Sequence, residues 1–244
     1  GKIVNMKLAQ SLVDVFRSQS IAVLGNVLIA MGLAALIAFG YQYKTGEPLM
    51  NADQIAYQLH SIDPFAGTLW FAAIAGVWLF CSGIISGYFD NRSNYLNMRM
   101  RLTQHPLLKK LMSEKSRVKF ANYMHENYGS LIGNLCFGML LGITGVVGYL
   151  THLPLDIRHV AFSSANVGYI AVSGQFTYSL LLQCIGFVLL IGLVNLVVSF
   201  SLTLWVALRS LNAEIESWWP IWYEVCQIVK KRPLSLFFPV QLDK

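Results

Sequence analysis

The sequence is poor in charge. Only 12% of its 244 residues are charged, whereas 55% are hydrophobic, and the mean hydropathy is +0.53. Soluble domains usually carry about a quarter charged residues, so the composition argues against an ordinary soluble protein. Four long stretches contain no Asp, Glu, Lys, Arg or His, and each can cross a bilayer core of roughly 30 Å as a helix. We therefore predict an all-α, polytopic membrane helix bundle with spans at 21–39, 65–88, 131–150 and 180–208.

The absence of ionisable groups from these spans also limits the function. Proton relays and ion pathways are usually built from such groups, so a pump or coupled transporter is disfavoured. The spans do contain polar side chains, and Asn195 and Ser199 lie four residues apart on one helical face. In lipid such groups usually form hydrogen bonds between helices. The alternative is that they line a conduction path, which would indicate a transporter or channel.

The four cysteines form no CxxC motif and no pair within one loop. This pattern argues against a disulfide framework or a zinc site and predicts thiols that fill helix contacts. His60 and His152 fall in predicted loops, but nothing in their spacing defines a coordination geometry. We expect no metal and no cofactor.

The cations that are present are unevenly distributed, which predicts the topology. The positive-inside rule places the Lys- and Arg-rich segments in the cytoplasm. We therefore expect a multi-pass protein of the bacterial inner membrane with both termini cytoplasmic, and the net charge of +6 requires no nucleic acid partner. Lys and Arg together number 3, 1, 8, 1 and 5 in the segments 1–20, 40–64, 89–130, 151–178 and 209–244.

Three segments outside the spans are expected at the membrane surface. Residues 1–20 place apolar side chains at helical spacing, which predicts an amphipathic helix. The basic loop 89–130 predicts two short amphipathic helices divided near His105-Pro106. The segment 209–244 combines tryptophans with a basic run, which is typical of an interfacial helix. The same side chains can stack on single-stranded nucleic acid, but directly after a span we favour the interfacial role.

Glycines spaced four residues apart predict sites of helix packing. Such GxxxG motifs allow two helix backbones to approach closely. We expect contacts inside one bundle rather than a ligand groove. The motifs are Gly83 with Gly87, Gly129 with Gly133, and Gly138 with Gly142.

The sequence Asp90-Asn91-Arg92 stands where the second span is expected to meet the cytoplasm. One interpretation is a helix end with a local pair between Asp90 and Arg92. The alternative is a binding site for a lipid headgroup or a partner, because arginine can hold a phosphate group through two parallel hydrogen bonds.

The stretch from Leu153 to Tyr169 lies between the third and fourth spans and contains Asp156, Arg158 and His159. Its apolar part is too short to cross a membrane, so residues 158–175 are expected to form a re-entrant or interfacial segment covered by protein. An Asp156–Arg158 bridge that holds this turn is the structural interpretation. The alternative is a catalytic cluster in which Asp156 and His159 share one helical turn. Three small polar residues are further candidates for ligand or lipid binding: Ser163, Ser164 and Asn166.

Three blocks of the chain resemble the bacterial Gcr-type membrane protein family, which carries the name "site-specific recombinase". The likeness covers roughly residues 65–208. It implies that the chain is the C-terminal membrane part of a longer protein, with a mostly helical upstream region as one partner. The blocks are Cys81–Arg92, Leu153–Tyr169 and Gly192–Phe200.

The recombinase name conflicts with the residues present. A tyrosine recombinase needs arginines, a His-x-x-Arg element and a nucleophilic tyrosine around a DNA phosphate. Arg158 and His159 are instead predicted on the non-cytoplasmic side, and no other residues supply that set. We therefore expect no recombinase activity and no nucleic acid partner.

The leading functional hypothesis is a non-enzymatic membrane module for anchoring, assembly or envelope-lipid handling. Its expected partners are membrane lipid, the upstream region, and either a second copy or another membrane protein. A membrane enzyme or lipid transferase that uses Asp156, Arg158 and His159 is the alternative from a different class, and a transporter or channel is the third.

Overall fold

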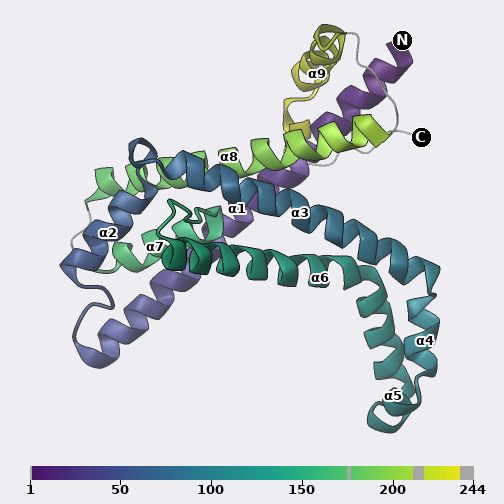
Figure 1. Cartoon of the computed structure of the whole chain (residues 1–244), viewed down its shortest axis with the longest axis horizontal. Helices are drawn as coiled ribbons and strands as arrows, with labels where there is room; N and C mark the ends of the chain where they lie inside the picture. The colour runs from purple at the N-terminus through teal and green to yellow at the C-terminus, as the bar shows by residue number, and fades with distance from the viewer. Residues whose placement is uncertain (1, 175–176, 211–216, 237–244) are drawn as a thin grey trace. The chain divides into compact units, whose positions relative to one another are not determined.

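The computed structural model describes residues 2–174, 177–210 and 217–236. No strand occurs among these residues, which confirms the all-α prediction. The elements in chain order (Figure 1) are α1 (Lys2–Thr45), α2 (Ala52–Ile62), the 3₁₀ helix η1 (Pro64–Ala66), α3 (Thr68–Tyr95), α4 (Met98–Gln104), α5 (Pro106–Leu111), α6 (Glu114–Thr151), α7 (Val160–Ala171), α8 (Tyr178–Ser210), α9 (Trp219–Lys231) and the 3₁₀ helix η2 (Pro233–Leu236).

Four of the helices, α1, α3, α6 and α8, are long and apolar enough to cross a membrane. Three of the four uncharged runs lie wholly within these helices. The run predicted at 65–88 lies in α3 only from Thr68 onward, because Pro64–Ala66 form η1 and Gly67 has a left-handed backbone. Only 17% to 28% of the residues in the most apolar windows of the four helices are buried inside the chain. Because large exposed apolar faces are rare on soluble proteins, these helices are suited to contact with lipid. The chain is a membrane protein of the predicted class.

The first of these helices is longer than the sequence predicts. Residues 2–20 of the expected amphipathic segment and the expected span 21–39 form one continuous helix of 44 residues, α1. The helix also passes through Gly40, where a connection was expected to begin. It ends at Gly46, which has a φ of 79° and whose N–H donates to the carbonyl of Gln42 at 2.8 Å. A left-handed glycine of this kind is a common helix terminator.

The basic loop 89–130 also differs from the prediction. The chain breaks at His105-Pro106 as predicted, but a second break follows at Met112-Ser113. There Ser113 caps α6 by accepting a hydrogen bond from the N–H of Ser116. The second half of the loop is therefore the start of a 38-residue helix rather than a separate short one.

The chain divides into two compact units, which are described separately. Unit 1 comprises Gly1–Leu69, Arg158–Leu196 and Leu204–Lys244, and unit 2 comprises Trp70–Ile157 and Val197–Thr203. Of the predicted C-terminal segment 209–244, residues 211–216 and 237–244 lie outside the described part of the chain.

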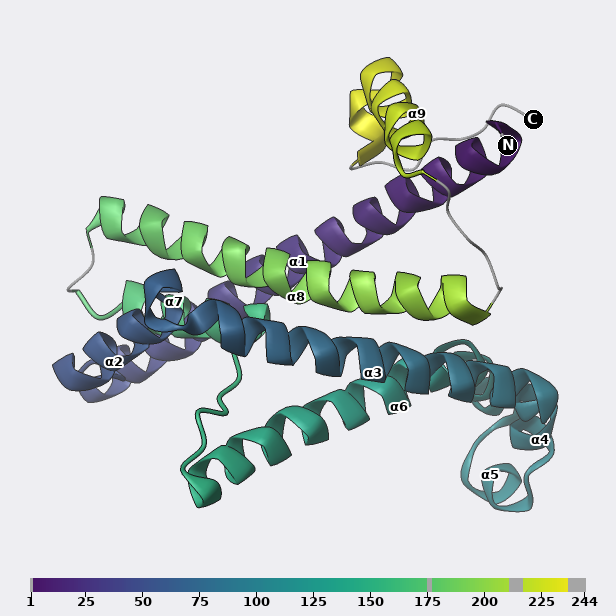
Figure 2. The ribbon, with the colours of Figure 1, turned by 45° about the horizontal axis from the view of Figure 1, so that its top comes forward.

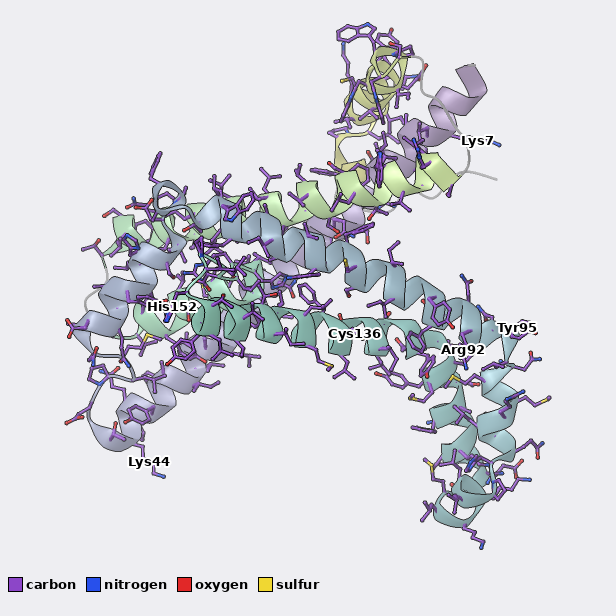
Figure 3. All side chains as sticks on the ribbon, viewed as in Figure 1. Lys7, Lys44, Arg92, Tyr95, Cys136 and His152 are labelled. Carbon is purple, nitrogen blue, oxygen red and sulfur yellow. The ribbon has the colours of Figure 1, made fainter. Side chains whose placement is uncertain are left out.

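Unit 2 is built on an antiparallel pair of long helices, α3 and α6, which lie close together near α4 and α5 and diverge toward the start of α3 (Figure 2). Residues later in α3 contact residues earlier in α6. Figure 3 accordingly shows Arg92 and Tyr95 at one end of the pair and His152 at the other. Three contacts define the register: Asp90 with Gly129, Ser82 with Gly133, and the Trp78 indole with the Thr144 hydroxyl at 2.9 Å.

In unit 1, α7 packs against α1 and α2. The closest approach is at Gly168, where a Cβ atom would collide with the carbonyl oxygen of Met31 and lie 3.0 Å from the Cβ of Ala34. Met31 and Ala34 belong to the apolar run of α1. The short α7 therefore has the protein cover that such a segment needs. Its depth in the membrane stays a prediction, and residue 175 at its expected end lies outside the described residues.

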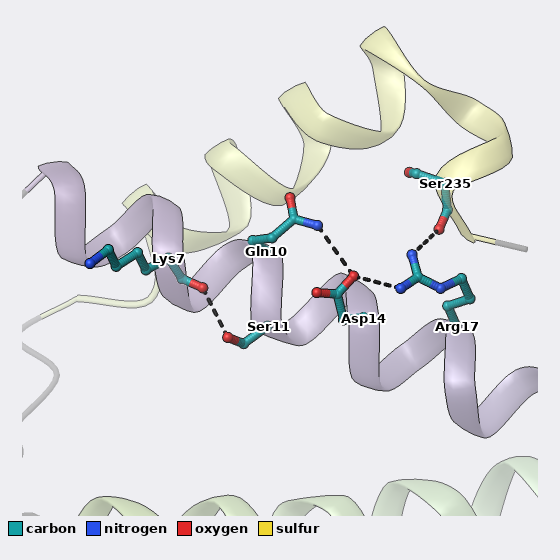
Figure 4. Close-up of polar contacts among 6 residues, drawn as sticks. All are labelled: Lys7, Gln10, Ser11, Asp14, Arg17 and Ser235. Carbon is teal, nitrogen blue, oxygen red and sulfur yellow. Dashed lines mark hydrogen bonds and ion pairs between the residues drawn. The ribbon is translucent and has the colours of Figure 1, made fainter. Parts of the chain in front are cut away.

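Helix α9 and the following η2 pack against the N-terminal part of α1. Arg17 connects them, because its guanidinium donates to the carbonyl of Ser235 at 3.1 Å and forms an ion pair with Asp14 at 2.8 Å (Figure 4). On α9, Ile221 is buried, whereas Trp219 is 79% exposed. The helix thus presents one apolar face to α1 and an aromatic face outward.

Candidate functional site

The candidate cluster around Arg158 and His159 lies in an extended segment. Residues 155–159 have no helical conformation, and α7 begins only at Val160. The proposed sharing of one helical turn by Asp156 and His159 is therefore wrong. The physical reason is that His159 has extended backbone angles, φ −108° and ψ 140°, and serves as the N-cap of α7.

The start of α7 is capped by a side chain from another helix. Asn195 of α8 accepts a hydrogen bond from the N–H of Val160 at 3.1 Å and donates one to the carbonyl of Arg158 at 3.0 Å. Asn195 is only 2% exposed. The first N–H groups of a helix have no partner within it, so this one amide satisfies backbone groups on both sides of the chain's entry into α7.

Arg158 also bonds to the backbone. Its Nε donates to the carbonyl of Ser61, at the end of α2, at 2.7 Å. Thr68, the first residue of α3, donates its hydroxyl to the same carbonyl at 3.0 Å. The guanidinium thus ties the segment before α7 to the turn between α2 and α3.

His159 is buried, with 9% of its surface exposed. Its Nδ1 accepts a hydrogen bond from the N–H of Ala161 at 3.4 Å, and Phe162 packs edge-on against the ring. Burial lowers the pKa of His159 to about 4, since the charged imidazolium is disfavoured away from water. The imidazole is neutral at pH 7.

The small polar residues of α7 face other parts of the protein. Ser163 and Ser164 are 2% and 0% exposed, and the Ser164 hydroxyl donates to the carbonyl of Val160 at 2.6 Å. The Asn166 amide donates to Gln58 of α2 at 2.7 Å. The Asn166 bond therefore links α7 to α2, whereas the Ser164 bond lies within α7 itself.

Asp156 belongs to unit 2, whereas Arg158 and His159 belong to unit 1. Its carboxylate accepts a hydrogen bond from the N–H of Ile157 at 2.7 Å. Among the described residues, no three His, Cys, Asp or Glu side chains gather in a way that could hold a metal ion.

The sequence Asp90-Asn91-Arg92 does not end a helix. Helix α3 continues to Tyr95, and Asp90 accepts a hydrogen bond from the N–H of Gly129 at 2.9 Å. Arg92 donates to the hydroxyl of Tyr88 at 3.3 Å, and Asn91 is exposed. The predicted helix end is thus wrong, because α3 continues past Arg92. The Asp90 carboxylate binds the backbone of α6 across the helix pair.

The GxxxG motifs differ in what they contact. At Gly129 a Cβ atom would collide with Asp90 and with the carbonyl of Ser86, and at Gly133 it would lie 3.1 Å from the carbonyl of Ser82. This motif therefore holds α3 and α6 together. At the other four predicted packing positions, no described atom of the chain comes within 4 Å of an added Cβ: Gly83, Gly87, Gly138 and Gly142.

Asn195 and Ser199 also have different roles, although they share one face of α8. Asn195 is buried against α7, and Ser199 is half-buried and accepts the Thr203 hydroxyl at its backbone carbonyl. Of these two polar residues, Asn195 caps α7, whereas the hydrogen bond at Ser199 lies within α8.

A cavity that the sequence did not reveal lies where α3 ends. It has a volume of about 210 Å³ and is lined in part by Ser93 and Arg101. The Ser93 hydroxyl lies 3.0 Å from Nδ1 of His125. These residues come from α3, α4 and α6, so no local spacing could have indicated their proximity. The available signal was compositional, since the surrounding loop is the most basic part of the chain.

Comparison with known proteins places these features in a family. No curated protein and no solved structure matches the chain. A family model described as site-specific recombinase matches residues 1–239, which is nearly the whole sequence. The chain, with its four membrane-compatible helices, belongs to the site-specific recombinase family.

Proposed function

We propose that this chain is a non-enzymatic module of the bacterial inner membrane that anchors and assembles envelope components and contacts lipid. The observation that supports this most directly is the use of the polar side chains beside α7. Asn195 and Arg158 bond to backbone groups, and His159 caps the helix. Side chains engaged in this way stabilise a joint between helices, which is a structural role.

The open glycine faces support a role in assembly. One GxxxG motif, at Gly129 and Gly133, is used within the chain. Two motifs of the same kind, on α3 and α6, have room for a Cβ atom at every glycine. Because small residues permit close helix approach in lipid, these faces suit a helix from a second copy, from another membrane protein or from an upstream region.

The family name suggests DNA strand exchange, and we do not assign that activity to this chain. Strand exchange would need several cations and a nucleophile around one DNA phosphate. Arg158 instead bonds to the carbonyl of Ser61, and Asp90 bonds to the N–H of Gly129.

The cytoplasmic orientation of both termini rests on the distribution of Lys and Arg.

The test is the assembly state of the full chain, purified in mild detergent and measured by native mass spectrometry. We expect complexes larger than one chain, or one chain with retained lipid or a co-purified membrane protein. Gly87→Leu and Gly142→Leu should each shift the distribution toward the monomer, whereas Ile143→Leu, an exposed position on the same helix as Gly142, should not. A lone monomer without lipid or partner would refute the proposal.

A further inference from the structure

The cavity at the end of α3 combines cations with an apolar lining. Arg92 and Arg101 contribute the charge, and a buried serine contributes a hydroxyl group. Most of the remaining lining is apolar. The residues that line it are Arg92, Ser93, Leu96, Met98, Arg101, Leu102 and Tyr128.

The turn after α3 creates this cavity. Asn97 has a left-handed backbone, with φ 47° and ψ 51°, and the chain reverses there so that α4 packs against α6. The reversal brings Arg101 of α4 to the same cavity as Arg92 of α3. The cavity wall is held in place by Ser93, which is 2% exposed and bonds to His125 at 3.0 Å and to the Met98 sulfur at 3.4 Å.

Both guanidinium groups are available to a ligand. Arg92 and Arg101 are exposed, and within residues 2–174, 177–210 and 217–236 no carboxylate forms an ion pair with either. Arg92 donates a hydrogen bond to the neutral hydroxyl of Tyr88. Two cations without a counter-charge at one cavity favour an anion, and the planar fork of arginine matches phosphate especially well.

The position of the cavity indicates which phosphate. It lies at the end of the α3–α6 pair where the uncharged run 65–88 ends and the uncharged run 131–150 begins. An aromatic cluster borders it, in which Phe89 stands edge-on to Tyr128 with ring centroids 5.5 Å apart. Aromatic residues favour the headgroup layer of a membrane, and the cytoplasmic leaflet is anionic.

We propose that this cavity binds the phosphate group of an anionic phospholipid from the cytoplasmic leaflet. The two arginines hold the phosphate, and the side chains of Leu96 and Leu102 contact the glycerol and the first methylene groups. The volume of about 210 Å³ is below the roughly 300–1,000 Å³ of sites for whole drug-sized ligands, so it suits a headgroup. The inference rests on the proposed function only in requiring that the chain contacts lipid.

The experiment compares lipid selectivity in the full chain and in charge-removing variants. The protein is purified in detergent and equilibrated with equal amounts of phosphatidylglycerol and phosphatidylcholine, and bound lipid is counted by native mass spectrometry. We expect the wild type to prefer phosphatidylglycerol, and Arg92→Gln/Arg101→Gln to lower that preference at least about tenfold. The control Lys110→Gln/Lys115→Gln removes the same charge from exposed positions of the same loop outside the cavity and should lower it much less. An equal loss in both double variants would overturn the site.

Three further arms identify the ligand. Arg92→Lys/Arg101→Lys keeps the charge but removes the planar guanidinium groups. A clear reduction of the preference for phosphatidylglycerol supports bidentate binding, and full retention of that preference overturns it. Glycerol 1-phosphate at millimolar concentration should not displace the lipid, and complete displacement would show a soluble phosphate as the ligand. Saturable binding of a DNA duplex that depends on both arginines would overturn the lipid assignment in favour of nucleic acid.

The assembly state separates this inference from the proposed function. If the glutamine variants keep the oligomeric state and helicity of the wild type but also its lipid preference, the cavity inference alone fails. If every variant and the wild type are monomers without lipid, the proposed function fails.

Discussion

The amide of Asn195 on α8 holds the first residue of α7. Its oxygen accepts from the N–H of Val160 at 3.1 Å, and its nitrogen donates to the carbonyl of Arg158 at 3.0 Å. The preceding turn of α8 also packs closely on α7, because a Cβ at Gly192 would lie 3.0 Å from a methyl group of Val160. A helix that starts among other helices, without water at its N–H groups, depends on such a partner.

Removing this cap should weaken the fold. We expect Asn195→Ala to lower the free energy of unfolding by about 1–2 kcal/mol, the usual cost of losing an N-cap, because the Val160 N–H and the Arg158 carbonyl lose their partner. Unfolding in denaturing detergent, followed by circular dichroism, measures this. Ser199→Ala, on the same face of α8 one turn later, is the control. An equal effect of both variants would contradict the assigned role of Asn195.

The packing of α3 on α6 should depend on Gly129 and not on Gly138. A methyl group at Gly129 meets Asp90 and the Ser86 carbonyl, whereas Gly138 has open space. We expect Gly129→Ala to destabilise the chain by about 1–3 kcal/mol, a typical cost of overpacking. Gly138→Ala should be neutral or slightly stabilising, because alanine is the better helix former. Thermal unfolding of both variants in one detergent tests this, and similar midpoints would refute the assigned contact.

The buried His159 should make stability depend on pH. Its folded pKa of about 4 lies below the value of about 6.5 in an unfolded chain, so between these values the unfolded state binds more protons. Stability is therefore complete above about pH 6.5 and decreases as the pH falls toward 4, by about 3 kcal/mol at most.

The matched variant for this test is His159→Asn, which keeps an N-cap acceptor but cannot titrate. It should flatten the pH dependence of unfolding between pH 6.5 and 4. His60→Asn, at an exposed position of α2, is the control for the histidine-to-asparagine exchange itself. A profile for His159→Asn that follows the wild type would show that another group is responsible.

The contact between α9 and α1 should depend on Ile221. This side chain is 1% exposed, whereas Trp219 is 79% exposed on the opposite face. We expect Ile221→Ala to cost about 2–4 kcal/mol locally and to increase protease cleavage and amide exchange in α9. Trp219→Ala should leave both unchanged in detergent. Enhanced cleavage in the tryptophan variant alone would contradict the packing.

The sequence was sufficient to predict those features that depend on neighbouring residues along the chain. Long uncharged runs identified the four membrane-compatible helices, since a helix in lipid satisfies its own backbone hydrogen bonds. The glycine spacing identified the motif at Gly129 and Gly133, but could not separate it from the open motif at Gly138 and Gly142. Whether a glycine motif is in contact depends on which helix lies opposite it, and the spacing of the glycines is the same in both motifs.

The candidate cluster shows the same limit. The sequence singled out Arg158, His159 and Asn195 as unusual residues between and within apolar runs. It could not show that Asn195, 35 residues after Val160, caps the helix that Val160 begins. It also gave no sign that Ser93 and His125 meet beside two arginines.

The sequence alone determined the class of the protein, its four apolar helices and the uneven charge that predicts its orientation. These follow from the transfer of side chains between water and lipid, which each segment undergoes independently. Only the tertiary structure decided that Asp90 bonds to α6 and that Arg92 and Arg101 share a cavity. Such pairings depend on how helices distant in sequence pack against one another, and local composition does not encode them.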